Sequence, residues 1–152
     1  MKENRSSAKP KVAASLEEVT FLELLRTTDQ FSRELSTVLK PDDISPSQYN
    51  VLRILRGSPN GLACGEISSR MITRDPDITR LLDRMEKRGW TLRFRDEHDR
   101  RVVKVRITGE GLKLVASLDK PVEQAHRQQL GHLSREQLRS LCELLRNARA
   151  NR

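Results

Sequence analysis

The hydrophobic period of this chain changes at Gly89, and that change limits the fold more than any other feature of the sequence. Before Gly89, apolar residues recur at i, i+3, i+4 and i+7, so we expect a helix that ends at Arg88 and buries one stripe. After Gly89, apolar and basic residues alternate over 92–95 and again over 103–107, which predicts two strands. The polar segment DEHDRR lies between them. The sequence therefore predicts an antiparallel hairpin.

The two faces of this hairpin are expected to differ in chemistry. In the first strand Leu92 and Phe94 alternate with Arg93 and Arg95, and in the second strand valine and isoleucine alternate with lysine and arginine. Such alternation predicts a sheet that is half buried and half basic. We therefore expect Arg93 and Arg95 to lie on the basic face.

Five further helices are predicted from apolar periodicity and capping residues. They are expected at 16–39, after Ser45 or Ser47, at about 64–71, after Thr108 and after Ser134. Pro121 is expected to kink or interrupt the helix that Thr108 begins. The order of elements makes the chain mainly α with a small β-hairpin wing, which is the order of a winged helix-turn-helix.

The segment TRDPDITRLLDR, residues 73–84, fixes the start of the helix before Gly89. Asp75 can cap this helix, because a short polar side chain accepts a hydrogen bond from a free N–H of the first turn. Pro76 then fits the first helical position, which tolerates a missing N–H. Asp77 suits the positive end of the helix dipole.

Positive charge is concentrated in one central segment. The formal net charge is +8, from 29 Lys and Arg against 21 Asp and Glu. Residues 70–106 contain twelve Lys and Arg against seven Asp and Glu, whereas 16–69 contain five against eight. The helix before Gly89 and the hairpin therefore suit a polyanionic partner, and their arrangement favours double-stranded DNA.

The open face of the basic helix offers groups that match a DNA major groove. Arg80 and Arg84 are four residues apart and project from one face, and either can contact guanine or a phosphate. Thr73 and Thr79 offer hydroxyl groups to phosphate and methyl groups to thymine. Asp77 can accept a hydrogen bond from the cytosine amino group.

The hairpin tip is the second candidate contact. Arg100 and Arg101 lie there, where arginine can enter a narrow minor groove, and Asp99 is placed to brace Arg101. The alternative is a solvated surface whose salt bridges each stabilise it by only a few tenths of a kcal/mol. The helix order, the sharp helix start and the basic hairpin together favour DNA.

Two segments resemble the MarR (multiple antibiotic resistance regulator) family of bacterial transcription factors. DRRVVKVRIT, residues 99–108, is similar to the family's wing signature D-x-R-x-x-x-V-x-L-T, with Ile107 in place of Leu. ITRLLDRMEKRGW, residues 78–90, is similar to the end of its recognition helix. By position, the resemblance assigns groove or phosphate contacts to Arg74, Asp77, Thr79, Arg80 and Arg84, and wing contacts to Asp99, Arg100 and Arg101. With Thr73, these are the candidate DNA-binding residues.

The resemblance also implies a domain plan. Residues 1–14 have the composition of a disordered tail, and 15–152 are expected to form a single MarR-like domain. Within it, about 45–108 would form the winged helix-turn-helix. The helices at about 16–39 and 109–149 would pair two copies into a homodimer that reads a palindromic operator.

The sequence departs from the family pattern next to the hairpin. Trp90 stands where a smaller Leu is usual, and Thr91 and Leu92 replace the common apolar-then-polar order. These departures leave the register of the inner strand open.

Sensing chemistry is less well defined by the sequence. Many family members release DNA when a small, often phenolic, molecule binds, and the candidate lining residues here are Phe31, Tyr49, Arg53 and Leu114, each of which is more simply core or surface. Cys64 is more simply a filler than a reactive thiol, and Cys142 is expected in the core. No metal site or cofactor is expected.

The sequence as a whole predicts a homodimeric DNA-binding transcription regulator, in this family more often a repressor, released by a small molecule or a stress signal. The alternative is a winged-helix protein-interaction module whose basic face binds an acidic protein. An enzyme is not expected, because no phosphate loop, G-x-S-x-G motif or metal cluster is present. No signal peptide or membrane span is predicted, so we expect a cytoplasmic, nucleoid-associated protein.

Overall fold

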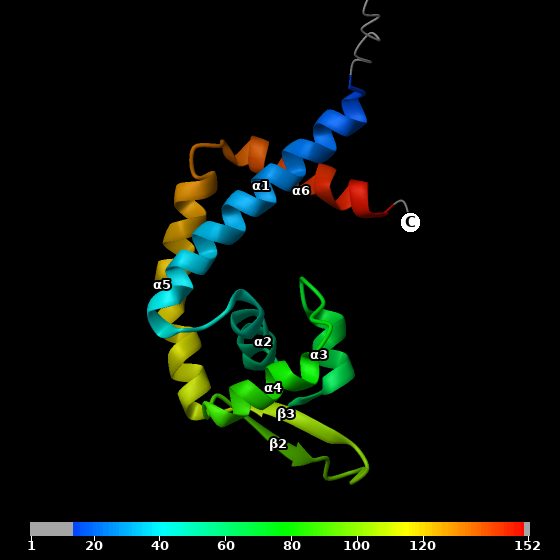
Figure 1. Ribbon diagram of the computed structural model, residues 1–152, viewed down its shortest axis with the longest axis vertical. Coiled ribbons are helices and arrows are strands. Elements are labelled where there is room, and N and C mark those ends of the chain that lie inside the picture. Colours follow the sequence, from blue (N-terminus) through cyan, green and yellow to red (C-terminus); the bar gives the residue numbers. More distant parts are fainter. Residues whose placement is uncertain (1–13, 151–152) are drawn as a thin grey trace, which may run out of the picture.

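The computed structural model of this chain describes residues 14–150. The expected tail over 1–14 therefore lies outside the described residues, except for Ala14. The elements, in chain order, are α1 (Leu16–Leu39), the 3₁₀ turn η1 (Lys40–Asp42), α2 (Pro46–Arg56), β1 (Leu62–Ala63), α3 (Cys64–Arg70), α4 (Ile78–Lys87), β2 (Thr91–Arg95), β3 (Val103–Ile107), α5 (Gly109–Leu130) and α6 (Arg135–Ala150). The expectation of a mainly α fold with a small β wing is confirmed (Figure 1).

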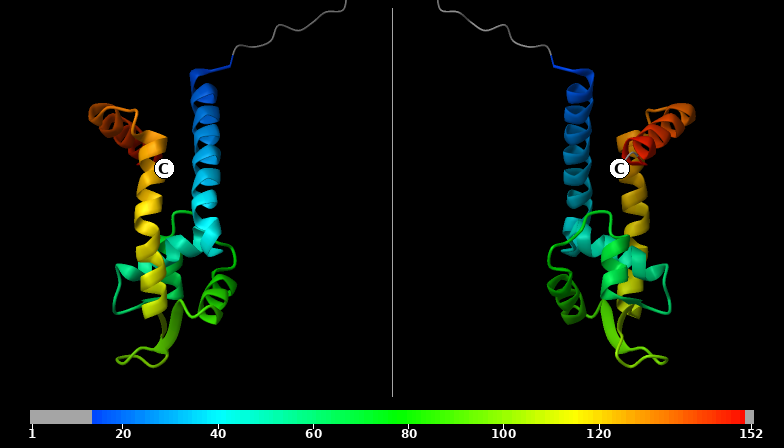
Figure 2. Two further views of the ribbon diagram at one scale, coloured as in Figure 1. Left: turned by 90° about the vertical axis from the view of Figure 1, so that its left-hand side faces the viewer. Right: turned by 90° about the vertical axis from the view of Figure 1, so that its right-hand side faces the viewer.

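The molecule has two parts that differ in shape. We define the lobe as residues 40–108, in which α2, α3, α4 and the sheet form a compact group (Figure 1). We define the arm as residues 16–34 of α1 together with α6, which rise away from the lobe (Figure 2). The helix α5 joins the two parts, because it begins at the sheet and runs beside α1.

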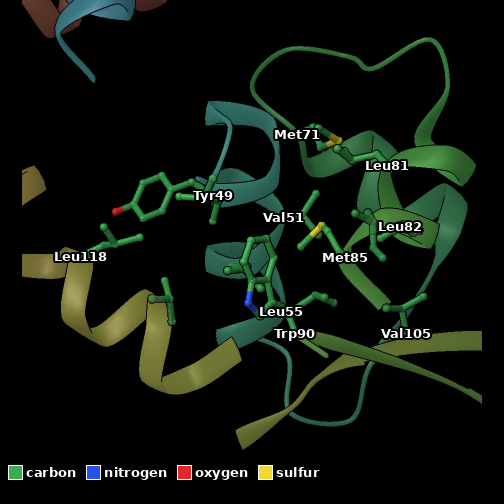
Figure 3. Packing of buried hydrophobic residues seen from close by; sticks show 14 of the residues in the cluster. Tyr49, Val51, Leu55, Met71, Leu81, Leu82, Met85, Trp90, Val105 and Leu118 are labelled. Carbon is green, nitrogen blue, oxygen red and sulfur yellow. The ribbon is translucent and has the colours of Figure 1, made fainter. Parts of the chain in front are cut away.

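One hydrophobic core fills the lobe and reaches α5 (Figure 3). Its most deeply buried side chains are Leu39, Val51, Leu52, Leu55, Ile67, Leu81, Leu82, Met85, Val115 and Leu118. Trp90 joins this core at 8% exposure, so the lobe accommodates a Trp where Leu is usual. Leu81, Leu82 and Met85 of α4 belong to this core, so α4 packs against the sheet and α3 and keeps its opposite face in solvent.

The helix α4 begins two residues later than the sequence predicted. Its cap is Asp77 and not Asp75, so Pro76 precedes the helix and does not occupy its first position. The Arg80 N–H donates to Asp77 Oδ1 at 3.1 Å, and the Asp77 N–H donates to Asp75 Oδ1 at 2.8 Å. Because Asp75 is used in the turn that leads into the helix, the second aspartate caps the first turn of α4.

The other helix ends agree well with the sequence. Ser45 and not Ser47 caps α2, in a capping box with Gln48. Ser134 forms the same kind of box with Gln137 at the start of α6. Gly89 ends α4 at a positive φ of 75°, where glycine is favoured.

The sheet has one strand more than the predicted hairpin. Its order is β1-β3-β2 with antiparallel pairing, and the two-residue strand β1 pairs Leu62 with Val105. Two residues are too few to show a period of two, so the sequence contained no signal for β1. The strand ties the segment before α3 to the wing.

The two faces of β2 are the reverse of those predicted. Thr91 and Arg93 lie opposite Ile107 and Val105 on the face toward the lobe, and Thr91 is 3% exposed. Leu92 is 42% exposed on the other face. The alternation itself is present, but Thr91 and Arg93 take the inner positions.

The helix α5 is attached firmly to the end of the wing. Thr108 caps it, and the Thr108 N–H and hydroxyl group donate to the carbonyl oxygens of Trp90 and Gly89 at 3.0 and 2.6 Å. A Cβ on Gly111 would lie 2.3 Å from the Trp90 carbonyl oxygen, so this close approach requires glycine. The helix runs through Pro121 without interruption.

Candidate nucleic-acid interface

The turn between α3 and α4 is held by hydrogen bonds from two sides. The Met71 N–H closes α3 on the Ile67 carbonyl at 3.1 Å, and the Ile72 N–H donates to Asn50 Oδ1 of α2 at 2.9 Å. The turn exposes Thr73 and Arg74. The helices α3 and α4 therefore form a helix-turn-helix whose turn is fixed to α2.

The helix α4 separates its apolar and polar faces sharply. Leu81, Leu82 and Met85 are buried, whereas the opposite face exposes Thr79, Arg80 and Arg84. No ion pair of Arg84 is formed with any residue of 14–150, so its guanidinium group faces solvent.

Asp77 uses both carboxylate oxygens within the protein. Oδ1 accepts the capping hydrogen bond from the Arg80 N–H, and Oδ2 lies 3.2 Å from Arg80 Nε. The carboxylate therefore contacts the arginine that follows it by one turn.

The wing tip is shaped by its own hydrogen bonds. Asp99 Oδ1 accepts from the Arg101 N–H at 3.0 Å, and the Asp99 carbonyl accepts from the Val102 N–H at 2.9 Å. Arg95 Nη1 donates to the Arg100 carbonyl at 2.8 Å. Asp99 thus braces the backbone of Arg101, and the Arg100 and Arg101 side chains are exposed.

An ion pair stiffens the base of this tip. Lys104 Nζ lies 2.9 Å from Asp96 Oδ1, and both side chains are largely shielded from solvent. The hydrogen bond from Lys104 lowers the pKa of the Asp96 carboxyl, and the same contact raises the pKa of Lys104. Both groups stay charged near neutral pH, so this pair holds the two strands together just before the tip.

A second ion-pair cluster joins the wing to α4. Arg93 Nη2 lies 2.6 Å from Asp83 Oδ1, and Arg93 Nη1 lies 2.8 Å from Glu86 Oε2. The other Glu86 oxygen accepts from the Arg93 N–H at 2.9 Å. Partial burial opposes the charged guanidinium group, but the two carboxylates outweigh it and raise the pKa of Arg93. This cluster explains why Arg93 faces inward, against the sequence prediction.

The candidate residues fall into two groups in space. The turn before α4 and the open face of α4 bring together Thr73, Arg74, Asp77, Thr79, Arg80 and Arg84. Asp99, Arg100 and Arg101 lie separately, at the far end of the β2–β3 hairpin (Figure 1). Arg93 was predicted to lie on the basic face of the hairpin, and the sequence signal for its contact with α4 is the pair of acids Asp83 and Glu86.

A cavity of about 520 Å³ opens between α1, α2 and the turn before α4. Tyr49, Arg53 and Ile72 contribute to its lining. Of the four predicted lining residues, Phe31 and Leu114 do not line it. Leu114 packs instead against the hydrophobic core.

The remaining predicted chemistry is limited. Cys64 is half-buried, and Cys142 is exposed on α6, so its expected place in the core is wrong for the single chain. Residues 14–150 contain no group of three or more His, Cys, Asp and Glu side chains that could hold a metal ion. Over the same residues, no helix combines the length and apolar character that crossing a membrane requires.

Comparison with known proteins gives consistent matches. The sequence model of the MarR family matches residues 44–103. The chain is 27% identical over 122 residues to the homoprotocatechuate degradative operon repressor of Escherichia coli, covering 80% of this chain and 82% of that protein.

Solved structures extend this likeness to almost the whole chain. A MarR transcription factor from Planctomyces limnophilus is 42% identical, with a TM-score of 0.68, covering 88% of this chain and 97% of that one. A mutant of E. coli MarR complexed with operator DNA has a TM-score of 0.78 at 24% identity, covering 90% of this chain and 99% of that one. The second likeness concerns the fold alone.

Proposed function

Because this chain belongs to the MarR family of transcription regulators, we propose that it binds an inverted-repeat operator as a homodimer and represses transcription until an effector binds. The family is not enzymatic, and its members act on DNA, so neither an enzyme nor a protein-interaction module is favoured.

The observation that carries the proposal is the pairing of two exposed basic surfaces on one rigid lobe. The open face of α4 presents Arg80 and Arg84, and the wing tip presents Arg100 and Arg101. The Arg93 cluster ties β2 to α4, so both surfaces belong to one connected lobe. A helix and a wing held in this way match a major groove and the adjacent minor groove.

We assign base and phosphate contacts to α4 and the turn before it. Arg80 and Thr79 lie in the first turn of α4, which is the part of a recognition helix that reaches base edges. Thr73, Arg74 and Arg84 flank this turn and are placed for phosphate contacts.

We assign the minor groove to the wing tip. Arg101 is exposed, and the hydrogen bond from its N–H to Asp99 fixes the backbone from which its side chain projects. We therefore assign to Asp99 the role of shaping the backbone of the wing tip, and to Arg100 and Arg101 that of providing its positive charge. Minor-groove arginines respond to groove width more than to single bases.

The arm supports a homodimer. None of the residues of α6 is buried, and even its leucines Leu144 and Leu141 are 66% and 37% exposed. In α1, Leu16 and Phe21 are 78% and 59% exposed. Apolar side chains gathered on unpacked helices indicate a surface that is covered in the working protein. A second copy that covers both arms would place two α4 helices on one duplex.

The cavity between α1, α2 and the turn before α4 supports an aromatic effector. Arg53 Cζ lies 6.0 Å from the centre of the Tyr49 ring, so the lining offers a cation beside an aromatic side chain. A phenol or an aromatic acid would suit both groups, and one relative is named for the operon that degrades homoprotocatechuate. Thr73 also lines the cavity, so an occupant would contact the turn that leads into α4.

Selection from a random duplex pool at moderate salt tests the proposal. Sequencing of the bound DNA should give an inverted repeat, and binding to it should weaken steeply as salt rises, because phosphate contacts release counterions. Bulk binding without any enriched sequence would contradict sequence-specific regulation. Binding to acidic proteins in place of DNA would restore the interaction-module alternative.

Two arginine substitutions test the assignment of the groups. Arg80→Ala should weaken operator binding by about 1–3 kcal/mol and relax the preference at one base step. Arg101→Ala should weaken binding to all duplexes more uniformly and reduce the slope of the salt dependence by about one. Titration of each variant against single-base operator variants separates the two, and an unchanged preference in Arg80→Ala would remove Arg80 from base reading.

A further inference from the structure

We propose that Asp77 acts through Arg80 as the specificity-determining pair of this protein, and that the pair reads guanine. The inference rests on the proposed function, because it needs α4 to lie in a major groove. It changes the role of Asp77 from a base contact to a positioning residue.

The geometry places the two oxygens of one carboxylate on two groups of one arginine. Asp77 Oδ1 accepts from the Arg80 N–H at 3.1 Å, and Asp77 Oδ2 lies 3.2 Å from Arg80 Nε. The backbone contact fixes the carboxylate at the start of α4, and the Nε contact then limits the directions that the guanidinium group can take. Arg80 is 80% exposed, so the rest of its side chain is free to meet a ligand.

The chemistry of the guanidinium group determines what such an arginine reads. Its donors form a planar fork, and when Nε is engaged by a carboxylate, Nη1 and Nη2 form the remaining edge. That edge matches the O6 and N7 acceptors of guanine in the major groove. In the complex, the carboxylate limits the directions of the guanidinium group, so its hydrogen bonds favour the one base whose acceptors lie along that direction.

The ion pair is weak in the free protein and stronger in the complex. An exposed pair three residues apart contributes little in water. When DNA covers α4 and removes solvent, the lower local dielectric strengthens the attraction between Asp77 and Arg80. The carboxylate also repels phosphate, so it disfavours placements of Arg80 on the DNA backbone.

Arg84 provides the contrast within the same helix. It is exposed one turn after Arg80, and none of the carboxylates of residues 14–150 lies within ion-pair distance of it. An arginine without such a brace can follow a phosphate group. We therefore expect base preference from Arg80 and general affinity from Arg84.

The decisive variant is Asp77→Asn. Asparagine caps a helix about as well as aspartate, so α4 keeps its start, but the side chain lacks the second anionic oxygen for Nε. The full-length protein and its variants are titrated against the selected operator with each of the four base pairs at every half-site position. Asp42→Asn removes one negative charge from an exposed side chain of η1 and serves as the charge-matched control.

The expected result is specific to one position. The unmodified protein should prefer guanine about tenfold there, whereas Asp77→Asn should prefer it threefold or less, with an unchanged midpoint of thermal unfolding. Arg80→Lys should lose the preference to the same extent, and Asp42→Asn should keep it. In an Arg80→Ala background, Asp77→Asn should change the base preferences no further.

Two outcomes would overturn the inference while leaving the proposed function intact. The Asp77→Asn protein could retain the full guanine preference, or could alter base preference equally in the Arg80→Ala background, which would make Asp77 a direct reader. A lower unfolding midpoint with intact guanine preference would make Asp77 a cap alone. Failure of the unmodified protein to enrich any operator would instead contradict the proposed function.

Discussion

The lobe and the arm differ in how much of their apolar surface a single chain buries. The lobe buries the side chains of α2, α3, α4 and β3 and joins its parts by the Arg93 cluster. In the arm, every residue of 16–30 is exposed, and α6 buries none of its residues. The same chain therefore contains a lobe with its own packed core and an arm whose apolar residues remain exposed.

This difference indicates where stability and affinity originate. Within the lobe, core burial and internal ion pairs set the geometry of the proposed DNA-binding surface. In the arm, the exposed leucines stabilise nothing in the single chain, and in the proposed dimer a second copy covers them. Substitutions in the two parts should accordingly have different effects, and three predictions test this separation in order of decreasing size.

Breaking the arm should have the largest effect. Leu144→Asp places a charge on an apolar residue that is 66% exposed in the single chain and covered in the proposed dimer. We expect a monomer with a folded lobe, and an operator affinity lower by about 100-fold or more because the two half-sites are no longer bound together. Light scattering and operator titration measure the two quantities.

The control for this prediction is Arg139→Ala. It changes the net charge by the same unit on the same helix, at a position away from the apolar stripe, and should remain dimeric. A dimeric Leu144→Asp protein with full operator affinity would show that α6 is not part of the association surface.

Breaking the Arg93 cluster should have an intermediate effect. Arg93→Ala leaves Asp83 and Glu86 without their shared partner, both only partly exposed. We expect a loss of about 1–2 kcal/mol in the free energy of unfolding, discounted for solvent access. Operator affinity should also fall, since the wing is no longer tied to α4.

Arg95→Ala is the matched comparison for the wing. It removes the hydrogen bond to the Arg100 carbonyl but no contact with α4. Urea unfolding should therefore show little change for Arg95→Ala and a clear loss for Arg93→Ala. Equal midpoints of urea unfolding for the two variants would mean that the Arg93 cluster does not stabilise the lobe.

Weakening the joint between the lobe and α5 should have the smallest effect. Arg56 Nη1 of α2 donates to both Asp119 oxygens, at 3.0 and 2.8 Å, and this hydrogen bond lowers the pKa of Asp119. A lowered carboxyl pKa stabilises the fold above the unfolded-state value of about 3.9, and the contribution is lost as the pH falls through the folded value.

The difference in unfolding free energy between the unmodified protein and Asp119→Asn should thus be constant from pH 7 to about pH 5. It should shrink below about pH 4. Thermal melts over this pH range measure it, and a difference that already disappeared near pH 6 would assign the effect to another group.

Local patterns predicted the helices well, and tertiary contacts account for the failures. The stripe of Leu81, Leu82 and Met85 located α4, and Ser45 and Ser134 located two further helix starts. The start of α4 was misplaced because Asp75 and Asp77 are both good caps, and only the folded turn uses Asp75 elsewhere.

The faces of β2 show a different limit of sequence reading. Alternation of Leu92 and Phe94 with Arg93 and Arg95 favours burial of the apolar pair, yet Arg93 lies inside because Asp83 and Glu86 of α4 meet it there. The alternation within the five residues of β2 contains no information about a contact with another helix, so it cannot predict this ion pair. The exposure of the candidate residues on α4 and the wing tip agrees with the sequence because it follows directly from local pattern, and their contacts with DNA stay a prediction.

The attachment of α5 to the wing makes that helix a lever. Thr108 and Gly111 fix its first turn against Gly89 and Trp90, and its 22 residues continue without interruption toward the arm. A rod of that length spans about 33 Å, so a tilt of about 5° at its base moves its far end by about 3 Å. In the proposed dimer, a tilt of α5 by the hairpin would therefore be magnified where the two arms meet, and a shift between the arms would reach the hairpin as a small change in its angle.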